Sequence, residues 1–129
     1  MVGPNPVSVP KAVAALTFLA TRTPTTTPSE SAGSFAELAA FRDGGIYVGH
    51  WAGTSEWERH SVADEIVMVV EGETEIFFQC DGREESASLG PGDLVIVPRG
   101  TWHRFETPAA VTLMSVTPQP SDHSPTSPA

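Results

Sequence analysis

The sequence predicts a single domain built almost entirely of short β-strands, with one helix near the N-terminus. Three observations lead to this fold class. The chain has 129 residues, a length that allows one hydrophobic core and not two. Its 11 glycines and 12 prolines supply many turns. Between those turns, short apolar runs recur without a helical period, which is typical of an antiparallel sandwich or barrel.

The composition excludes several classes of function. Seven Lys and Arg residues against sixteen Asp and Glu residues give a formal net charge of −9. An acidic chain without a basic cluster has no electrostatic means of binding nucleic acid or an anionic membrane, so we expect neither as a partner. No apolar stretch approaches the roughly 20 residues that span a bilayer. The single cysteine, Cys80, excludes a disulfide within the chain, and we expect a cytoplasmic location.

Residues 1–33 are predicted to form a short helix and an extended arm that packs on the β domain or on a partner subunit. Pro10 suits the first turn of a helix, and the apolar residues behind it recur at helical spacing, which predicts a helix over Lys11–Ala20. A secretory signal is the alternative interpretation of this apolar run. Residues 21–34 are rich in Thr, Ser and Pro, as in a loop or arm.

From residue 34 onward the pattern is strand, turn, strand, and we place the β domain at residues 34–118. Turns such as Asp43-Gly44-Gly45 and Asp81-Gly82 contain glycines, which take the positive φ that tight hairpins require. Strands are expected at 35–41, 46–51, 66–70, 74–80, 83–89, 94–97, 102–107 and 111–117. Residues 119–129 have no apolar side chain larger than proline, so we expect a flexible tail there.

Two short segments concentrate side chains that can bind a metal ion. In the first, Glu58 and His60 are two residues apart, so on an extended segment they point to the same face. A short turn then allows Glu65 to return beside them. In the second, a rigid corner of Pro and Gly that ends at Gly100 delivers His103 onto a strand. Imidazole and carboxylate groups in this combination are typical ligands of divalent transition metals.

These two segments resemble the paired motifs of the cupin superfamily. The first family motif, Gly-x5-His-x-His-x(3,4)-Glu-x6-Gly, is matched from its second histidine by His60-x4-Glu65-x6-Gly72. The second, Gly-x5-Pro-x-Gly-x2-His-x3-Asn, is matched by Gly92, Pro98, Gly100 and His103. The resemblance covers residues 46–116. It implies an all-β, single-domain jelly-roll barrel that holds a divalent metal inside, and a homodimer as the default assembly.

Three departures from the family motifs are visible. Glu58 stands where the family has its first histidine, and the leading glycine is shifted by one residue to Gly53. Thr107 replaces the closing asparagine, a position that is not a ligand in the family. Of these changes, the one at Glu58 decides the metal chemistry.

The predicted metal ligands are therefore Glu58, His60, Glu65 and His103. The last three alone would hold Fe(II) on one face and leave positions open. If Glu58 also ligates, two carboxylates favour a harder ion, so Fe(II) or Mn(II) is preferred and Ni or Zn is the alternative. If Glu58 does not ligate, it can orient a ligand or act as a general acid or base.

Two functions follow from this site. The first is a metal-dependent enzyme, an oxygenase or an isomerase/lyase, that acts on a small organic molecule. The alternative is a non-catalytic protein that binds a metal or small ligand, such as a sensor. Among the other histidines, His50 is expected to lie at the rim or to be partly buried, with a place in the pocket lining as the alternative, and His123, in the tail, is expected to take no part.

Overall fold

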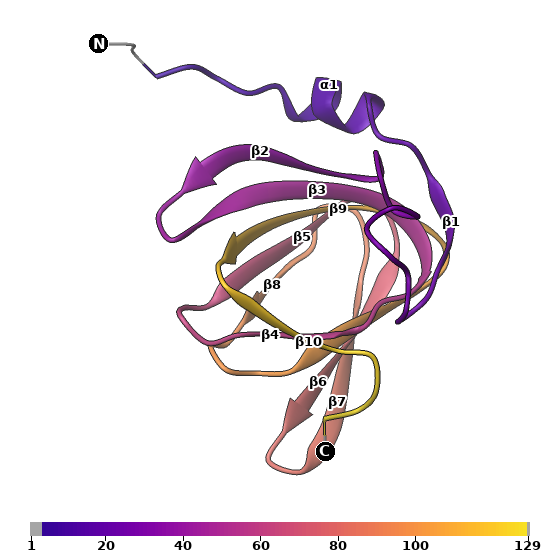
Figure 1. The fold of residues 1–129 in the computed structure, drawn as a ribbon, viewed down its shortest axis with the longest axis vertical. Helices are drawn as coiled ribbons and strands as arrows, with labels where there is room; N and C mark the ends of the chain where they lie inside the picture. The colour runs from indigo at the N-terminus through magenta and orange to yellow at the C-terminus, as the bar shows by residue number, and fades with distance from the viewer. Residues whose placement is uncertain (1–3, 129) are drawn as a thin grey trace.

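The computed structural model describes residues 4–128, and strands dominate it (Figure 1). The prediction of an all-β domain with one short helix is confirmed. Among the described residues, no helix is both long and apolar enough to cross a membrane. In chain order the elements are α1 (Val9–Ala14), β1 (Leu19–Arg22), β2 (Phe35–Phe41), β3 (Gly44–Thr54), β4 (Trp57–His60), β5 (Glu65–Gly72), β6 (Thr74–Cys80), β7 (Arg83–Leu89), β8 (Leu94–Val97), β9 (His103–Pro118) and β10 (Ser121–Ser124).

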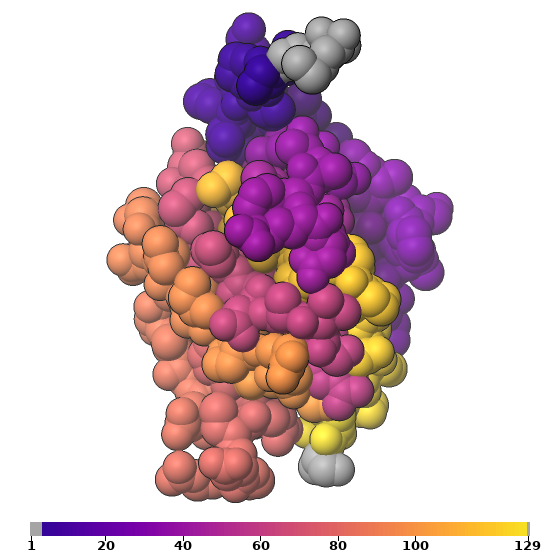
Figure 2. All heavy atoms as spheres, turned by 90° about the vertical axis from the view of Figure 1, so that its left-hand side faces the viewer, coloured from indigo at the N-terminus to yellow at the C-terminus, as the bar shows by residue number. Residues whose placement is uncertain are grey.

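The hairpin between β6 and β7 follows directly from its turn residues. Asp81 and Gly82 have φ values of 49° and 76°, so both central residues adopt the left-handed conformation that a type I′ turn requires. This turn sets the register in which Cys80 pairs with Arg83. The space-filling view places this hairpin at one end of the molecule and the N-terminal helix at the other (Figure 2).

Strand β9 organises the sheet. It is one strand of 16 residues where the sequence predicted two. Its first half pairs with β6 on one side and with β4 and the end of β3 on the other, and its second half pairs with β3 on one side and β5 on the other. Among the described strands, β7, β8 and β10 each pair with a single neighbour, so the sheet does not close. The fold is an open sandwich, and the term barrel describes it only loosely.

Alternation along the strands separates the core from the outer face. In β5, Glu65, Val67 and Val69 are buried, whereas Ile66 between them is 39% exposed. The same face therefore carries both core valines and the motif glutamate. The core cluster consists of Trp51, Val67, Val69, Ile76, Leu89, Val97, Phe105 and Val111.

The N-terminal helix is shorter than predicted. It begins at Val9, behind the N-cap Ser8, and ends at Ala14 instead of continuing to Ala20. The helix ends early because residues Leu19–Arg22 form β1, which runs parallel to β3 and pairs Arg22 with Gly53. Gly53 has a φ of 115°, and a Cβ atom at this position would overlap the Arg22 carbonyl oxygen. The displaced motif glycine thus permits the close approach of β1.

The prediction of a flexible tail over residues 119–129 is wrong for Ser121–Ser124. These residues form β10, which pairs antiparallel with β4, so that Ser121 lies opposite His60 and His123 opposite Glu58. Main-chain hydrogen bonds to an open strand edge need no apolar side chain, which is why composition did not reveal this strand. An ion pair between Arg59 and Asp122, at 3.0 Å, also fixes the two strands together.

Candidate metal centre

Three strands bring the four predicted metal-binding side chains to one place. Glu58 and His60 lie on β4, Glu65 begins β5, and His103 begins β9. Each side chain offers one ligand atom, and these four atoms all lie within 4.8 Å of one another. His60, Glu65 and His103 are fully buried, whereas Glu58 is partly exposed. The pairing of Glu58 with His103 across β4 and β9 contributes to this convergence.

The distances within the group are short. The Nε2 atom of His60 lies 2.8 Å from Glu58 Oε1 and 3.3 Å from Glu65 Oε2. On the other side, His103 Nε2 lies 3.0 Å from Glu65 Oε1. Glu65 is therefore the central member, with one carboxylate oxygen toward each imidazole.

The buried atoms of this group fit a cation. Among the described residues, His60 Nε2, His103 Nε2 and Glu65 Oε1 are shielded from solvent, and the short contacts between them do not have the geometry of hydrogen bonds. Buried polar atoms without partners are costly and rare in folded proteins. A divalent ion shared by these atoms would satisfy all three, and the mixed imidazole and carboxylate donors suit Fe(II), Mn(II), Ni(II) or Zn(II).

The opposite nitrogen of each imidazole is held by a second contact. His103 Nδ1 lies 3.1 Å from the carbonyl oxygen of Thr101. Because a carbonyl oxygen only accepts, Nδ1 is the donor in this contact, which leaves Nε2 as the atom that would bind a metal. His60 Nδ1 lies 2.9 Å from the Ser121 hydroxyl. Both rings are thus oriented with Nε2 toward the group.

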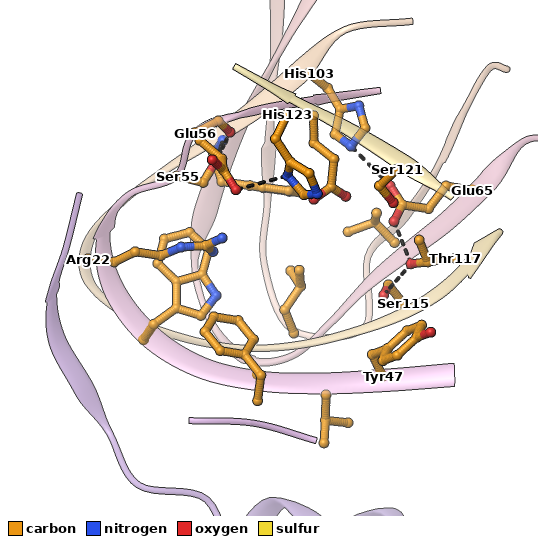
Figure 3. A pocket seen from close by; sticks show the side chains of 18 of the residues that line it. Arg22, Tyr47, Ser55, Glu56, Glu65, His103, Ser115, Thr117, Ser121 and His123 are labelled. Carbon is orange, nitrogen blue, oxygen red and sulfur yellow. Dashed lines mark hydrogen bonds and ion pairs between the residues drawn. The ribbon is translucent and has the colours of Figure 1, made fainter. Parts of the chain in front are cut away.

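The carboxylate of Glu65 is oriented as well. Thr117 donates a hydrogen bond of 2.6 Å from its hydroxyl to Glu65 Oε2, and Ser115 lies 2.8 Å from that hydroxyl (Figure 3). Both hydroxyls come from the second half of β9. This chain of hydrogen bonds holds Oε1 free, so that oxygen points to His103.

The pKa values in this group are shifted because its imidazoles and carboxylates lie within 2.8–3.3 Å of one another. Burial alone would lower the pKa of His60, but the adjacent carboxylates of Glu58 and Glu65 outweigh it and raise this pKa from 6.5 to about 9. Burial would raise the pKa of Glu65, but His103 and His60 outweigh it and hold this pKa well below its usual 4.5. A proton on His60 therefore occupies the place that a metal ion would take.

A cavity of about 250 Å³ opens beside the group. Its apolar lining includes Phe35, Trp51 and Leu113. Its polar lining includes Glu56 and Glu58 together with Arg22, Tyr47, Ser115, Gln119 and His123. The cavity has the mixed lining and the size that suit a small organic molecule.

Of the two histidines outside the group, His123 lies where the sequence did not place it, and His50 does not. His123 was expected to take no part, but it lines the cavity, and its Nδ1 lies 2.9 Å from Glu56 Oε1 and 3.6 Å from Glu58 Oε2 (Figure 3). His50 was expected at the rim or partly buried, and it is partly buried. It lies on the opposite face of β3 from Trp51 and packs against Phe18 at a ring distance of 4.8 Å.

Sequence reasoning also missed the cavity residues that strands β1 and β10 contribute. These are Arg22 and Ser121, neither of which belongs to a recognisable motif. The shifted glycine at Gly53 was the one available signal, because it marks where another strand approaches the motif.

Comparison with protein families identifies the class of protein. The family described as "Cupin domain" matches residues 49–117, which is more than half of the chain. This chain belongs to the cupin family. The match covers β4 to β8, nearly all of β9 and about half of β3, and therefore all four residues of the candidate metal centre.

The curated relatives cover shorter stretches. Over 60 residues, the chain is 35% identical to an acireductone dioxygenase of Rhodopseudomonas palustris (strain TIE-1), covering 46% of this chain and 36% of the relative. Over 54 residues it is 37% identical to the uncharacterized protein YdbB of Bacillus subtilis (strain 168), covering 42% of this chain and 45% of that protein. The match thus spans about a third of the length of the dioxygenase and less than half of the Bacillus protein.

Solved structures show the same fold at low identity. A cupin-2 domain protein of Shewanella frigidimarina NCIMB 400 gives a TM-score of 0.58 at 24% identity, over 67% of this chain and 80% of that one. Hydroquinone 1,2-dioxygenase of Sphingomonas sp. TTNP3 gives 0.57 at 15% identity, over 67% and 65%. The cupin domain of Drosophila melanogaster CENP-C gives 0.58 at 17% identity, over 64% and 67%. One fold therefore serves dioxygenases and a CENP-C protein, so the fold alone does not define a function.

Proposed function

We propose that Glu58, His60, Glu65 and His103 bind one divalent metal ion, and that the loaded protein is an enzyme acting on a small organic molecule. The observation that carries this proposal is the convergence, beside a cavity, of three buried atoms that make no hydrogen bond. Fe(II) or Mn(II) is the preferred ion because two carboxylates would neutralise its charge, and Ni or Zn is the alternative.

The reaction class that we favour is an oxygenase, with an isomerase or lyase as the second choice. Two of the similar proteins are named as dioxygenases, which supports the first class. When bound, the metal would supply a Lewis acid and, if redox-active, a site for O2. The residues of the chain orient that ion, and the apolar lining excludes water from part of the cavity.

Glu58 is the member of the group with two candidate roles. It is more exposed than the other three and borders the cavity, so it is accessible to a bound molecule. As a ligand it would complete a four-residue set. As a free carboxylate it would act as a general base, at the position where the family has a histidine. Retention of the metal in a Glu58→Gln variant that has lost turnover would assign the second role.

The test of metal binding is elemental analysis of the chain purified without added metal and again after reconstitution with Fe(II) or Mn(II). We expect one equivalent in the wild type and a loss of most of it in His103→Ala. His50→Ala is the matched control, because His50 lies on the outer face of β3, and it should retain the metal. Equal metal content in His103→Ala and wild type would overturn the assignment.

A non-catalytic binding protein or sensor is the alternative function. It is favoured by one observation: the cavity histidine outside the group, His123, is already paired with Glu56. Oxygen-consumption assays of the Fe(II)-loaded chain against enediols, thiols and keto acids distinguish the two functions. Consumption that depends on both metal and substrate supports the enzyme, and its absence with all three classes supports the sensor.

A homodimer and a cytoplasmic location are part of the same proposal. The outer face of β5 and β8 leaves Ile66, Leu94 and Ile96 exposed by 39%, 57% and 49%. A contiguous apolar sheet face of this kind suits contact with a second copy of the chain. Sedimentation velocity at micromolar concentration measures this assembly directly.

A further inference from the structure

The cavity contains one arginine whose charge has no partner. Among residues 4–128, three arginines are half-buried: Arg22, Arg59 and Arg104. Arg59 pairs with Asp122 at 3.0 Å, and Arg104 pairs with Glu106 at 2.7 Å. Within the same described range, Arg22 has no carboxylate within 4 Å and its side chain makes no hydrogen bond. Because an unpaired cation that is partly removed from water is costly, this site favours the binding of an anion.

The guanidinium of Arg22 is held in the cavity by aromatic rings. It lies 4.5 Å from the ring centre of Trp51 and 5.0 Å from that of Phe35. Stacking of this kind fixes the plane of the guanidinium and leaves the N–H groups at its edge free to donate. Burial lowers the pKa of Arg22, with Glu58 and Glu56 opposing the shift, but a guanidinium stays charged at neutral pH.

The backbone that carries Arg22 is also fixed. Arg22 closes β1, and its carbonyl packs against Gly53, where any side chain would collide. In Figure 3, Arg22 stands on one side of the cavity, and Glu65 and His103 stand on the other. A molecule in the cavity would therefore meet a fixed cation at one end and the candidate metal centre at the other.

We propose that Arg22 binds the carboxylate of a small apolar monocarboxylic acid, which is the substrate or ligand of this cavity. The planar fork of a guanidinium matches a carboxylate with two parallel hydrogen bonds. Glu56 and Glu58 also line the cavity, and their negative charge disfavours a doubly charged anion such as a phosphate ester. The apolar lining of Phe35, Trp51 and Leu113 suits a hydrocarbon body. Whether this acid is a substrate and not only a ligand rests on the proposed function.

The test compares benzoate with benzamide, which has nearly the same shape and no charge, using calorimetry on the full chain. We expect the wild type to bind benzoate at least about tenfold more tightly than benzamide. In Arg22→Gln, benzoate binding should weaken by at least about tenfold and benzamide binding should not change. Arg22→Lys keeps the charge and loses the fork, so its benzoate affinity should fall between the two.

Arg42→Gln is the matched control. Arg42 is exposed and stacks on Phe41 at 5.4 Å, outside the cavity, so this variant makes the same change in net charge without touching the site. It should bind benzoate as the wild type does. A thermal melt of each variant checks that it is folded. If Arg22→Gln does not fold, Arg22→Lys tests the proposal in its place.

Three outcomes would overturn the inference. They are equal affinity of the wild type for benzoate and benzamide, equal benzoate affinity of folded Arg22→Gln and wild type, and tighter binding of phenyl phosphate than of benzoate. Each titration is run on metal-free and Mn(II)-loaded chain, with metal content measured for every variant. Benzoate binding that needs Arg22 but no metal supports the inference even if metal binding fails. Binding that needs the metal and not Arg22 contradicts it.

Discussion

The strands inside the cupin match and the strands that flank it contribute differently to the cavity. Strands β4, β5 and β9 lie within or almost within residues 49–117, and they supply all four side chains of the candidate metal centre. Strands β1 and β10 lie outside it, and they supply Arg22, Ser121 and His123. The matched strands thus supply the whole candidate metal centre and part of the cavity lining, and the flanking strands add further polar side chains to that lining.

The same division holds for the core. Every residue of the buried cluster, from Trp51 to Val111, belongs to the matched segment, whereas β1 contributes only the half-buried Leu19 at its margin. Flanking strands attached by backbone pairing at sheet edges can change without dismantling the core.

The largest expected effect is on stability, and it separates the two regions. Ile76 is fully buried within the core cluster, and Ile76→Ala should lower the free energy of unfolding by about 2–5 kcal/mol. Leu19→Ala removes a side chain at the edge of that cluster and should cost less than half as much. Urea denaturation followed by fluorescence measures both. Equal losses would mean that β1 belongs to the core and that the division is wrong.

The second-largest expected effect is on metal affinity. It tests whether strand β10 orients a metal-binding side chain of strand β4. Ser121→Ala removes the hydroxyl that lies 2.9 Å from His60 Nδ1. Loss of a contact that orients a metal-binding imidazole should weaken Mn(II) affinity by about 10–100-fold. Competition with a chromogenic chelator measures this change.

Ser124→Ala is the control for that variant. Ser124 lies on the same strand, but its hydroxyl donates to the Thr126 carbonyl and does not touch the group. Its Mn(II) affinity should match the wild type. A wild-type affinity in Ser121→Ala would show that β10 covers β4 without orienting His60.

The smallest expected effect is on how the stability of the metal-free chain depends on pH. The pKa of His60 is raised from 6.5 to about 9, so its protonated form stabilises the fold below about pH 6.5 and this contribution is lost as the pH rises toward 9. The pKa of Glu65 is lowered from 4.5, so its contribution is present above about pH 4.5 and is lost in stronger acid. His60 and Glu65 together should therefore stabilise the metal-free fold most between about pH 4.5 and pH 6.5.

Thermal melts at pH 6 and pH 9 check this prediction. The Tm of metal-free wild type should fall between these values by more than that of His60→Gln, which lacks the titrating group. Mn(II) should raise the Tm more at pH 8 than at pH 6, because at lower pH a proton competes for His60. An identical fall in Tm in both proteins would mean that His60 does not titrate in this range.

Local patterns in the sequence account for most of the fold and for the four side chains of the group. Glu58 and His60 share a face because a strand alternates every two residues, and the fixed lengths of the following turn and corner position Glu65 and His103. The turn at Asp81-Gly82 is likewise a local property of two residues.

The flanking strands could not be predicted because their pairing is not local. β10 has no apolar alternation, and its register depends on contacts such as that between Arg59 and Asp122, 63 residues apart. β1 covers the end of the predicted helix and the start of the predicted arm, and its parallel pairing with β3 depends on space at Gly53. The roles of Arg22 and His123 follow from these pairings, so no motif could assign them.

A crystal structure of the Mn(II)-loaded chain with anomalous diffraction data tests the candidate metal centre most directly. We expect one strong anomalous peak bonded by His60 Nε2, His103 Nε2 and a Glu65 carboxylate oxygen, with Glu58 at the same ion. A peak bonded by other residues, or full Mn(II) in solution with no peak between β4, β5 and β9, would contradict this expectation.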